Sequence, residues 1–312
     1  MKLRLDPWPA DYEPAIETDG QPASGASIDP AVEQAEWRSL PAPCLAPLRC
    51  EFVDGVRRVE ARVLAEAGTR WVHGLFGSMA VGTVTVRDGR AAFGAVNVER
   101  LLILGGGEPQ SWQVRGVPVA FSGAVCDENH PHVVMAELQS RMQQQEAAFA
   151  EEAAARGGCV FVDGLSYRAT GHREVVGVIK RILEPYVDEE RFALVPRLQP
   201  QERTPLFSIT DGVYPRFSAF LRLAVPRPID HPLAGVVRIE IGAAVGLERA
   251  RALADSAAAA LPRFASTTAR DPRAPQNLLP VGALEAEMKR RLGDPVLIRR
   301  AIERELHEQR DR

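Results

Sequence analysis

The sequence predicts a single α/β domain preceded by an extended N-terminal arm. Three features predict it: β-rich segments begin near residue 48, a long helical segment then ends at Gly157-Gly158, and a short apolar strand, "CVFVDGL", follows directly. Strands and helices alternate through the rest of the chain, as is typical of an α/β fold. No internal repeat is present, so a solenoid is excluded.

Residues 1–47 form the predicted arm, and residues 48–312 form the predicted domain. The arm is rich in Pro, Gly, Ser and acidic residues, as in "DGQPASGASIDP", a composition typical of loops. One short helix is predicted over "PAVEQAEW", residues 30–37. The arm has too little apolar content to fold alone, so we expect it to pack on the domain, to support dimerisation or to dock a partner.

The first part of the domain is predicted to be an antiparallel meander. "RCEFVDG" is a predicted strand ending at its Asp-Gly, and "RRVEARVLAEAG" alternates apolar and polar residues as a half-buried strand does. Two further β-rich runs with glycine punctuation follow, "TRWVHGLFGSMAVGTVTVRDG" and "AAFGAVNVERLLILGG".

The later elements alternate in type. The segment "HVVMAELQSRMQQQEAAFAEEAAARGG" predicts a long helix with a glycine stop, and "CVFVDGL" a strand at the centre of a sheet. Strands are also predicted at "REVVGVIKRIL" (strand or strand-to-helix), "PRFSAFLRLAV" and "GVVRIEIG". Helices are predicted at "DEERFALV", "GLERARALADSAAAALPRFA", "VGALEAEMKRRLG" and "PVLIRRAIERELHEQR".

Composition narrows the function classes. The chain has 312 residues, 46% of them hydrophobic and 25% charged, and no apolar run long enough to cross a bilayer or to serve as a secretion signal. The four cysteines form no CxxC pair, so we expect a reducing cytoplasm and no zinc knuckle. A net charge of −3 argues against non-specific DNA coating, but an enzyme with a local basic groove is still compatible with it.

The tetrapeptide "FVDG" occurs twice, at residues 52–55 and 161–164. Asp54 and Asp163 therefore each follow an apolar run that predicts a strand, and ligands gather at strand ends in open α/β sheets. If the two strands are neighbours, the carboxylates form a hard-oxygen site suited to Mg²⁺ or Mn²⁺. The alternative is that each Asp-Gly is an ordinary turn.

A third acid is expected from the helix between the two aspartates. Its candidates are Glu137, Glu146, Glu151 and Glu152. We favour Glu146, because about three helical turns followed by the strand would return it to the side of Asp163.

Basic residues follow both aspartates and could contact a phosphate backbone. The candidates are Arg57, Arg58, Arg168, Arg173, Lys180 and, beside Asp271, Arg273. Lys180 follows the apolar run "VVGVI" and is the one expected to point into the site. The alternative for each of the others is a solvated surface charge. The chain has no GxGxxG order, no GK[ST] and no G-x-S-x-G, so a nucleotide-binding loop and a serine hydrolase have no support.

Four segments occur in an order that resembles the NurA family of DNA repair nucleases. They are "CEFVDGVRRVEARV", "FVDGLSYR…REVVGVIKRI", "FSAFLRL…GVVRIEI" and "APQNLLPVGALEAEMKRRLGD", within residues 48–310. The resemblance implies a ribonuclease H-like mixed sheet flanked by helices, a homodimer, and Mn²⁺-dependent hydrolysis of DNA, with Mg²⁺ as the alternative metal. It also implies 5′→3′ exonuclease activity on single- and double-stranded DNA, endonuclease activity on single strands, and work with a HerA-type hexameric translocase in resecting DNA ends for recombinational repair in the cytoplasm, at the nucleoid.

By the same resemblance, the family's metal-site acids fall on Asp54, Glu146 and Asp163. The family's late histidine has no counterpart in "DPRAPQNLLPVGALE", where Asp271 or Asn277 is expected to take its space. Lys180 and the nearby arginines are expected to neutralise phosphate charge.

Two other functions are compatible with the sequence. One is a catalytically weak dimeric adaptor that docks and stimulates the translocase, which the missing histidine favours and the surviving pair of aspartates opposes. The other is a ribonuclease H-like enzyme of another substrate class, such as a ribonuclease or a junction resolvase.

Overall fold

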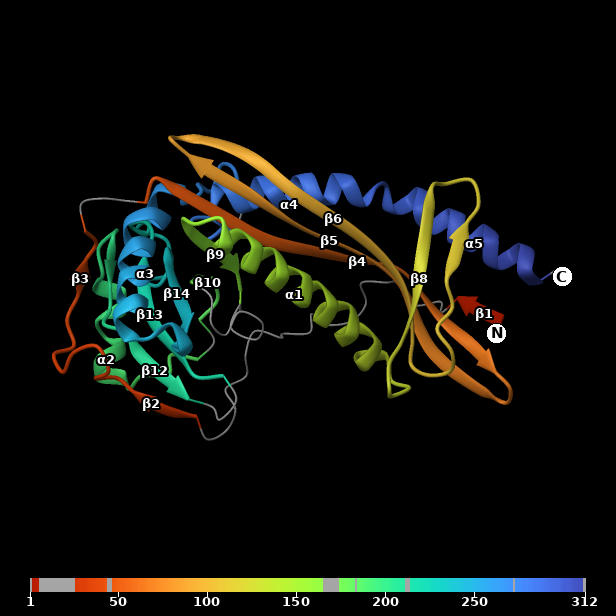
Figure 1. The fold of residues 1–312 in the computed structure, drawn as a ribbon, viewed down its shortest axis with the longest axis horizontal. Coiled ribbons are helices and arrows are strands. Elements are labelled where there is room, and N and C mark those ends of the chain that lie inside the picture. Colours follow the sequence, from red (N-terminus) through yellow and green to blue (C-terminus); the bar gives the residue numbers. More distant parts are fainter. Residues whose placement is uncertain are drawn as a thin grey trace.

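The computed structural model describes residues 2–5, 26–43, 47–164, 174–182, 184–210, 214–271 and 273–310. Its described strands join into one long mixed sheet, with helices packed against both faces (Figure 1). The prediction of an α/β fold with a mixed sheet is confirmed. Among these described residues, no helix is both long and apolar enough to span a membrane.

Five strands and one helix form the centre of the fold. Strands β4 (Arg49–Ala67), β5 (Arg70–Arg87) and β6 (Arg90–Leu104) are an antiparallel meander. Helix α1 (Pro131–Ala155) then leads into β9 (Cys159–Asp163), which is parallel to β4, and β10 (Val175–Ile179) is parallel to β9. These five strands lie side by side in the order β6-β5-β4-β9-β10. Numbered by their order along the chain, they are strands 3-2-1-4-5, which is the topology of a ribonuclease H-like core.

Helix α1 forms where the sequence supplies both its ends and an apolar face. His130 caps its N-terminus by accepting the backbone N–H of His132, and Pro131 occupies the first turn. Val134, Leu138 and Met142 recur at four-residue spacing and are buried against the sheet. Gly157 and Gly158, both with positive φ, end the helix as predicted.

The prediction that the first strand ends at Asp54-Gly55 is wrong. Strand β4 continues through both residues to Ala67, because β5 pairs with it along its whole length. Asp163 does end its strand, and Gly164 adopts a φ of +91° directly after it. Since β9 stops at Asp163, the edge of β4 that faces it is left open just beyond Asp54. The site described below opens at this step in the sheet.

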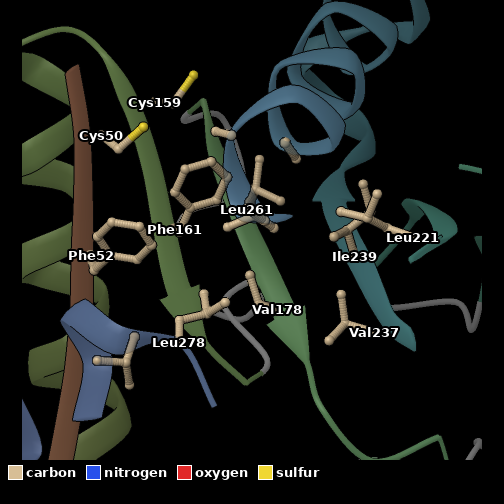
Figure 2. Close-up of a cluster of buried hydrophobic side chains, with 14 of the residues drawn as sticks. Cys50, Phe52, Cys159, Phe161, Val178, Leu221, Val237, Ile239, Leu261 and Leu278 are labelled. Atoms are coloured by element: carbon tan, nitrogen blue, oxygen red, sulfur yellow. The ribbon is translucent and has the colours of Figure 1, made fainter. Parts of the chain in front are cut away.

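The repeated tetrapeptide is part of a longer repeat whose copies lie side by side. Cys-x-Phe-Val-Asp-Gly occurs at residues 50–55 and 159–164, and the two copies pair in register on neighbouring parallel strands. Phe52 and Phe161 are direct neighbours, with ring centroids 5.4 Å apart, and both point into the main core (Figure 2). The repeat therefore gives two adjacent strands the same buried face.

The sheet continues beyond β10 with two strands that the sequence predicts, β14 (Val236–Gly242) and β13 (Arg216–Arg222), and two that it does not, β12 (Phe207–Thr210) and β2 (Ser27–Asp29). The order is β10, β14, β13, β12 and β2. Helix α3 (Leu247–Ala260) packs its alanine-rich face on this part of the sheet. The remaining elements are β1 (Lys2–Leu5), β3 (Leu40–Pro41), β7 (Trp112–Val114), β8 (Val119–Val125), α2 (Glu189–Phe192), β11 (Glu202–Arg203), α4 (Leu279–Leu292), α5 (Pro295–Arg310) and three short 3₁₀ turns.

The described part of the N-terminal arm runs along the domain. Strands β1, β2 and β3 pair with β4, β12 and β11, respectively. The helix predicted over residues 30–37 is wrong, since the segment consists of turns and bends. The carboxylate of Glu33 instead accepts hydrogen bonds from Arg203 and from the backbone N–H of Leu206, which hold the segment in a non-helical conformation. The division at residue 47 stays a prediction.

Helices α1 and α4 cover opposite faces of the β4–β5 region (Figure 1). Helix α1 packs on the face that carries Val53 and Val162, whereas α4 packs on the face that carries Phe52 and Phe161. Helix α5 continues beyond α4 along the far end of the long hairpin. Side chains from both layers can therefore meet where β9 ends.

Candidate metal centre

Two aspartates meet because of strand register. Val53 pairs with Val162 in the parallel β4–β9 ladder, so the next residues along, Asp54 and Asp163, lie beside each other. Side chains alternate along a strand, which places both carboxylates on the face of Phe52. This is also the face that α4 covers.

Glu285 of α4 joins the two aspartates. Oxygen atoms of Asp54, Asp163 and Glu285 lie within 4.8 Å of one another, close enough for one cation to contact all three. Glu285 is not among the site residues that the sequence predicts. One signal for it was available: the helix places Glu285 on the same buried face as Val281 and Met288, at spacings of four and three residues, and an acid on an apolar face calls for a specific partner.

Glu146 reaches the same place from the opposite layer. Its carboxylate accepts a hydrogen bond from the backbone N–H of Gly55, and the side chain is buried. A Cβ atom on residue 55 would lie 2.5 Å from Oε1 of Glu146 and 2.8 Å from Cγ of Met142. The first "FVDG" therefore needs glycine for close approach of α1, whereas the second needs it for the positive φ of Gly164.

Three of these carboxyl groups have raised pKa values, whereas burial opposes the ionisation of Glu285 but its hydrogen bonds to Arg273 outweigh burial and lower its pKa. Burial raises the pKa of Asp54 well above its usual value, and the charges of Asp163 and Glu146 raise it further. Burial also raises the pKa of Asp163, although Lys180 opposes the shift. The pKa of Glu146 is raised to about 8, chiefly by burial and then by Asp163. Acids crowded in a buried space are stabilised as carboxylates when a cation is bound between them.

Within the part of the chain that the structure describes, one oxygen of this group has no hydrogen-bond partner. Oδ2 of Asp54 is buried and unpaired, which costs free energy in a folded protein unless another ligand contacts it. All the converging donors are carboxylate oxygens, the type that Mg²⁺ and Mn²⁺ prefer. These residues therefore fit a hard divalent cation.

A cavity of about 520 Å³ opens onto these carboxylates. It lies between α1, the end of β9, and the segment that precedes α4. Its walls include Asp54, Glu146 and Asp163, together with the cationic side chains Lys180 and Arg273. A space of this size can admit a phosphate group and its neighbouring sugar.

The predicted cationic residue Lys180 lies within the site. Its ammonium group contacts Oδ2 of Asp163 and donates to Oδ1 of Asn277 at 2.6 Å. The side chain is mostly buried, with 17% exposed. It follows the buried strand β10 by one residue, which fixes its approach to the carboxylates.

Asp271 lies beside the three converging carboxylates rather than among them. Its oxygens accept hydrogen bonds from Nε and the backbone N–H of Arg273 and from Nδ2 of Asn277. Burial acts to raise its pKa, but these bonds outweigh burial and lower the pKa to about 2. Arg273, a predicted basic residue of the site, also donates two hydrogen bonds of 2.9 Å to the Glu285 carboxylate.

The other basic candidates differ in what they contact. Arg57 donates to Gln139 of α1 and is partly buried, so it braces β4 against that helix. Arg58 donates to both carboxylate oxygens of Glu60 and to the carbonyls of Leu292 and Gly293 at the end of α4. Arg168 and Arg173 lie outside the described residues.

Comparisons with known proteins give a structural likeness but no matching sequence. Neither a protein-family model nor a curated protein sequence matches the chain. The chain is similar to the crystal structure of the NurA nuclease from Sulfolobus solfataricus, with 10% sequence identity, a TM-score of 0.49 and 88% of each chain covered.

Proposed function

We propose that this protein is a metal-dependent deoxyribonuclease that hydrolyses phosphodiester bonds. The observation that carries the proposal is the buried, unpaired Oδ2 of Asp54 beside the carboxylates of Asp163 and Glu285. Lys180 and Arg273 compensate Asp163 and Glu285, but a structural role alone gives no reason to leave a buried oxygen of Asp54 unpaired among the described residues, because an unsatisfied buried polar atom is costly.

Asp54, Asp163 and Glu285 would hold the cation, and Glu146 would complete the site from the other face of β4. A bound divalent cation lowers the pKa of an attacking water and offsets charge on the leaving oxygen. Lys180 and Arg273 line the same cavity and would orient a phosphate and neutralise its charge. No base-reading element is required, so binding would depend on the backbone and fall steeply with salt.

The finer parts of the proposal rest on the sequence resemblance. They are a preference for Mn²⁺ over Mg²⁺, 5′→3′ exonuclease activity on DNA ends, endonuclease activity on single strands, a homodimer, and cooperation with a HerA-type hexameric translocase in end resection for repair in the cytoplasm. Glu285 bears on the competing adaptor hypothesis. That hypothesis rests on the missing late histidine, and Glu285, in the same region of the chain, would supply a carboxylate ligand in its place.

The test is digestion of 5′- and 3′-labelled linear DNA with Mn²⁺, Mg²⁺ or EDTA. Wild type is compared with Asp54→Ala and Asp163→Ala, and labelled RNA and four-way junctions identify the substrate class. We expect metal-dependent cleavage of DNA that both substitutions abolish. An inert wild type, even with a translocase partner present, would favour the adaptor, and equal cutting by the variants would place the active site elsewhere.

A further inference from the structure

A series of hydrogen bonds leads away from the candidate metal centre through Asn277, which is connected in this series to the proposed ligand Asp163 only through Lys180. Lys180 contacts Asp163 and donates to Asn277, and Asn277 donates to Asp271. Asn277 is 1% exposed and lies just before α4. A buried amide at such a place fixes the geometry of whatever it contacts.

The orientation of the Asn277 amide is determined by its two neighbours. Lys180 can only donate, so it requires Oδ1, and the Asp271 carboxylate can only accept, so it requires Nδ2. Reversing the amide would set donor against donor and acceptor against acceptor. Gly282 leaves room for this arrangement, since a Cβ atom there would lie 3.3 Å from Nδ2 of Asn277.

The Lys180 ammonium has a competing destination. Oδ2 of Asp54 is buried and unpaired, and the charge of Lys180 acts on that carboxyl group without a hydrogen bond between them among the described contacts. An ammonium that moved between the carboxylates would occupy the place of a divalent cation. The hydrogen bond to Asn277 draws Lys180 to the side of Asp163 instead.

We propose that Asn277, oriented by Asp271, is a positioning residue that holds the Lys180 ammonium beside Asp163 and out of the space between the three carboxylates. This inference rests on the proposed function, because it assigns a role around the same metal centre. It makes Asn277 act on the cation only through Lys180.

The effect of Asn277→Ala on Mn²⁺ affinity should depend on whether Lys180 is present. Asn277→Ala should weaken Mn²⁺ binding about tenfold, as expected when a residue that supports a metal site is removed. In a Lys180→Met background, the same substitution should change Mn²⁺ affinity by less than about twofold, because the group that Asn277 restrains is gone. A packing role would give the same loss in both backgrounds.

An exchange of side chains gives a second, independent readout. Asn277→Asp alone sets two carboxylates against each other and should weaken Mn²⁺ binding. Combining it with Asp271→Asn removes this repulsion and restores one donor–acceptor contact between positions 271 and 277, while position 277 still accepts from Lys180. The double variant should therefore recover Mn²⁺ affinity to within about threefold of wild type.

The experiment is titration of full-length protein with Mn²⁺, without DNA, followed by electron paramagnetic resonance of the free ion. Urea unfolding of each variant identifies losses caused by instability. Coupling between positions 277 and 180, with recovery in the exchange variant, supports the inference. Equal losses in both backgrounds, or no recovery, overturn it. Cleavage is assayed separately, so a wild type that binds Mn²⁺ but does not cut DNA refutes the proposed function and leaves this result standing.

Discussion

The most demanding prediction concerns Gly55, where a single methyl group should separate the two layers of the site. The added Cβ atom of Gly55→Ala would lie 2.5 Å from Oε1 of Glu146, roughly 0.9 Å short of the 3.4 Å at which ordinary contact begins. The same atom would lie 2.8 Å from Cγ of Met142, on the same helix. Both atoms belong to side chains of α1, so relief requires Glu146 and the buried Met142 to change conformation or the helix to shift.

We expect Gly55→Ala to lower the free energy of unfolding by about 2 kcal/mol, within the range for overpacking a core. It should also weaken Mn²⁺ binding about tenfold, because Glu146 is displaced from the site. The assays are urea unfolding and Mn²⁺ titration. Gly89→Ala is the matched control: Gly89 has a φ of +75° and nothing within 4 Å, so it should lose about 1 kcal/mol of stability and no metal affinity. Wild-type stability and Mn²⁺ affinity in Gly55→Ala would refute the close approach of α1.

Three further predictions concern residues away from the carboxylates. Burial opposes ionisation of Glu33, but the Arg203 hydrogen bond and other contacts outweigh burial and lower the pKa of Glu33, so the ionised carboxylate stabilises the fold above its unfolded-state pKa and loses this effect as pH falls through its folded-state pKa. Glu33→Gln should therefore lower the free energy of urea unfolding by about 3 kcal/mol at pH 7 and by clearly less at low pH. An equal loss at both pH values would contradict the ion pair. Burial raises the pKa of the Cys50 thiol to about 12 from 9.0, so stability should fall by about 1.4 kcal/mol per pH unit between these values, and Cys50→Ala should show a shallower decline. Arg58→Ala leaves the carboxylate of Glu60 buried without Arg58 and should lower the free energy of unfolding by about 3 kcal/mol. The salt dependence of DNA binding should stay that of wild type. A weaker dependence of the binding constant on salt concentration would instead support the predicted phosphate contact.

The sequence predicts most elements of this fold because their signals are local. Helix α1 has an N-terminal cap, a buried stripe and a glycine stop in or beside its own residues. Helix α4 has a buried stripe and Gly293 directly after it, and Asp294 accepts hydrogen bonds from backbone N–H groups in the first turn of α5. The end of the first strand depends instead on pairing. Asp54-Gly55 reads as a turn, yet β5 pairs past it and keeps Gly55 extended within the ladder. The helix predicted around Glu33 does not form, because Glu33 binds Arg203, which is distant in sequence, and this contact fixes the backbone conformation there.

The site could be predicted in part for the same reason. Asp54 and Asp163 share a repeated motif, so the sequence itself indicates that their strands have equivalent environments. Glu285 belongs to a helix far along the chain, and its place depends on how α4 docks across β4 and β5. That docking has no local signature apart from an acid on an apolar helical face. Asp271 was a reasonable candidate by residue type, but the partners that surround it, Arg273 and Asn277, are set by tertiary structure.

The central claim is that Asp54, Asp163 and Glu285 together bind one divalent cation. The most direct test is an anomalous difference map from crystals grown with Mn²⁺, recorded on both sides of the manganese absorption edge. We expect a peak within coordinating distance of all three carboxylates that is lost in Glu285→Gln. The peak should be kept in Glu287→Gln, because the Glu287 side chain pairs with Arg290 and Arg291 on the same helix. A peak on other residues, or none at saturating Mn²⁺, would contradict it.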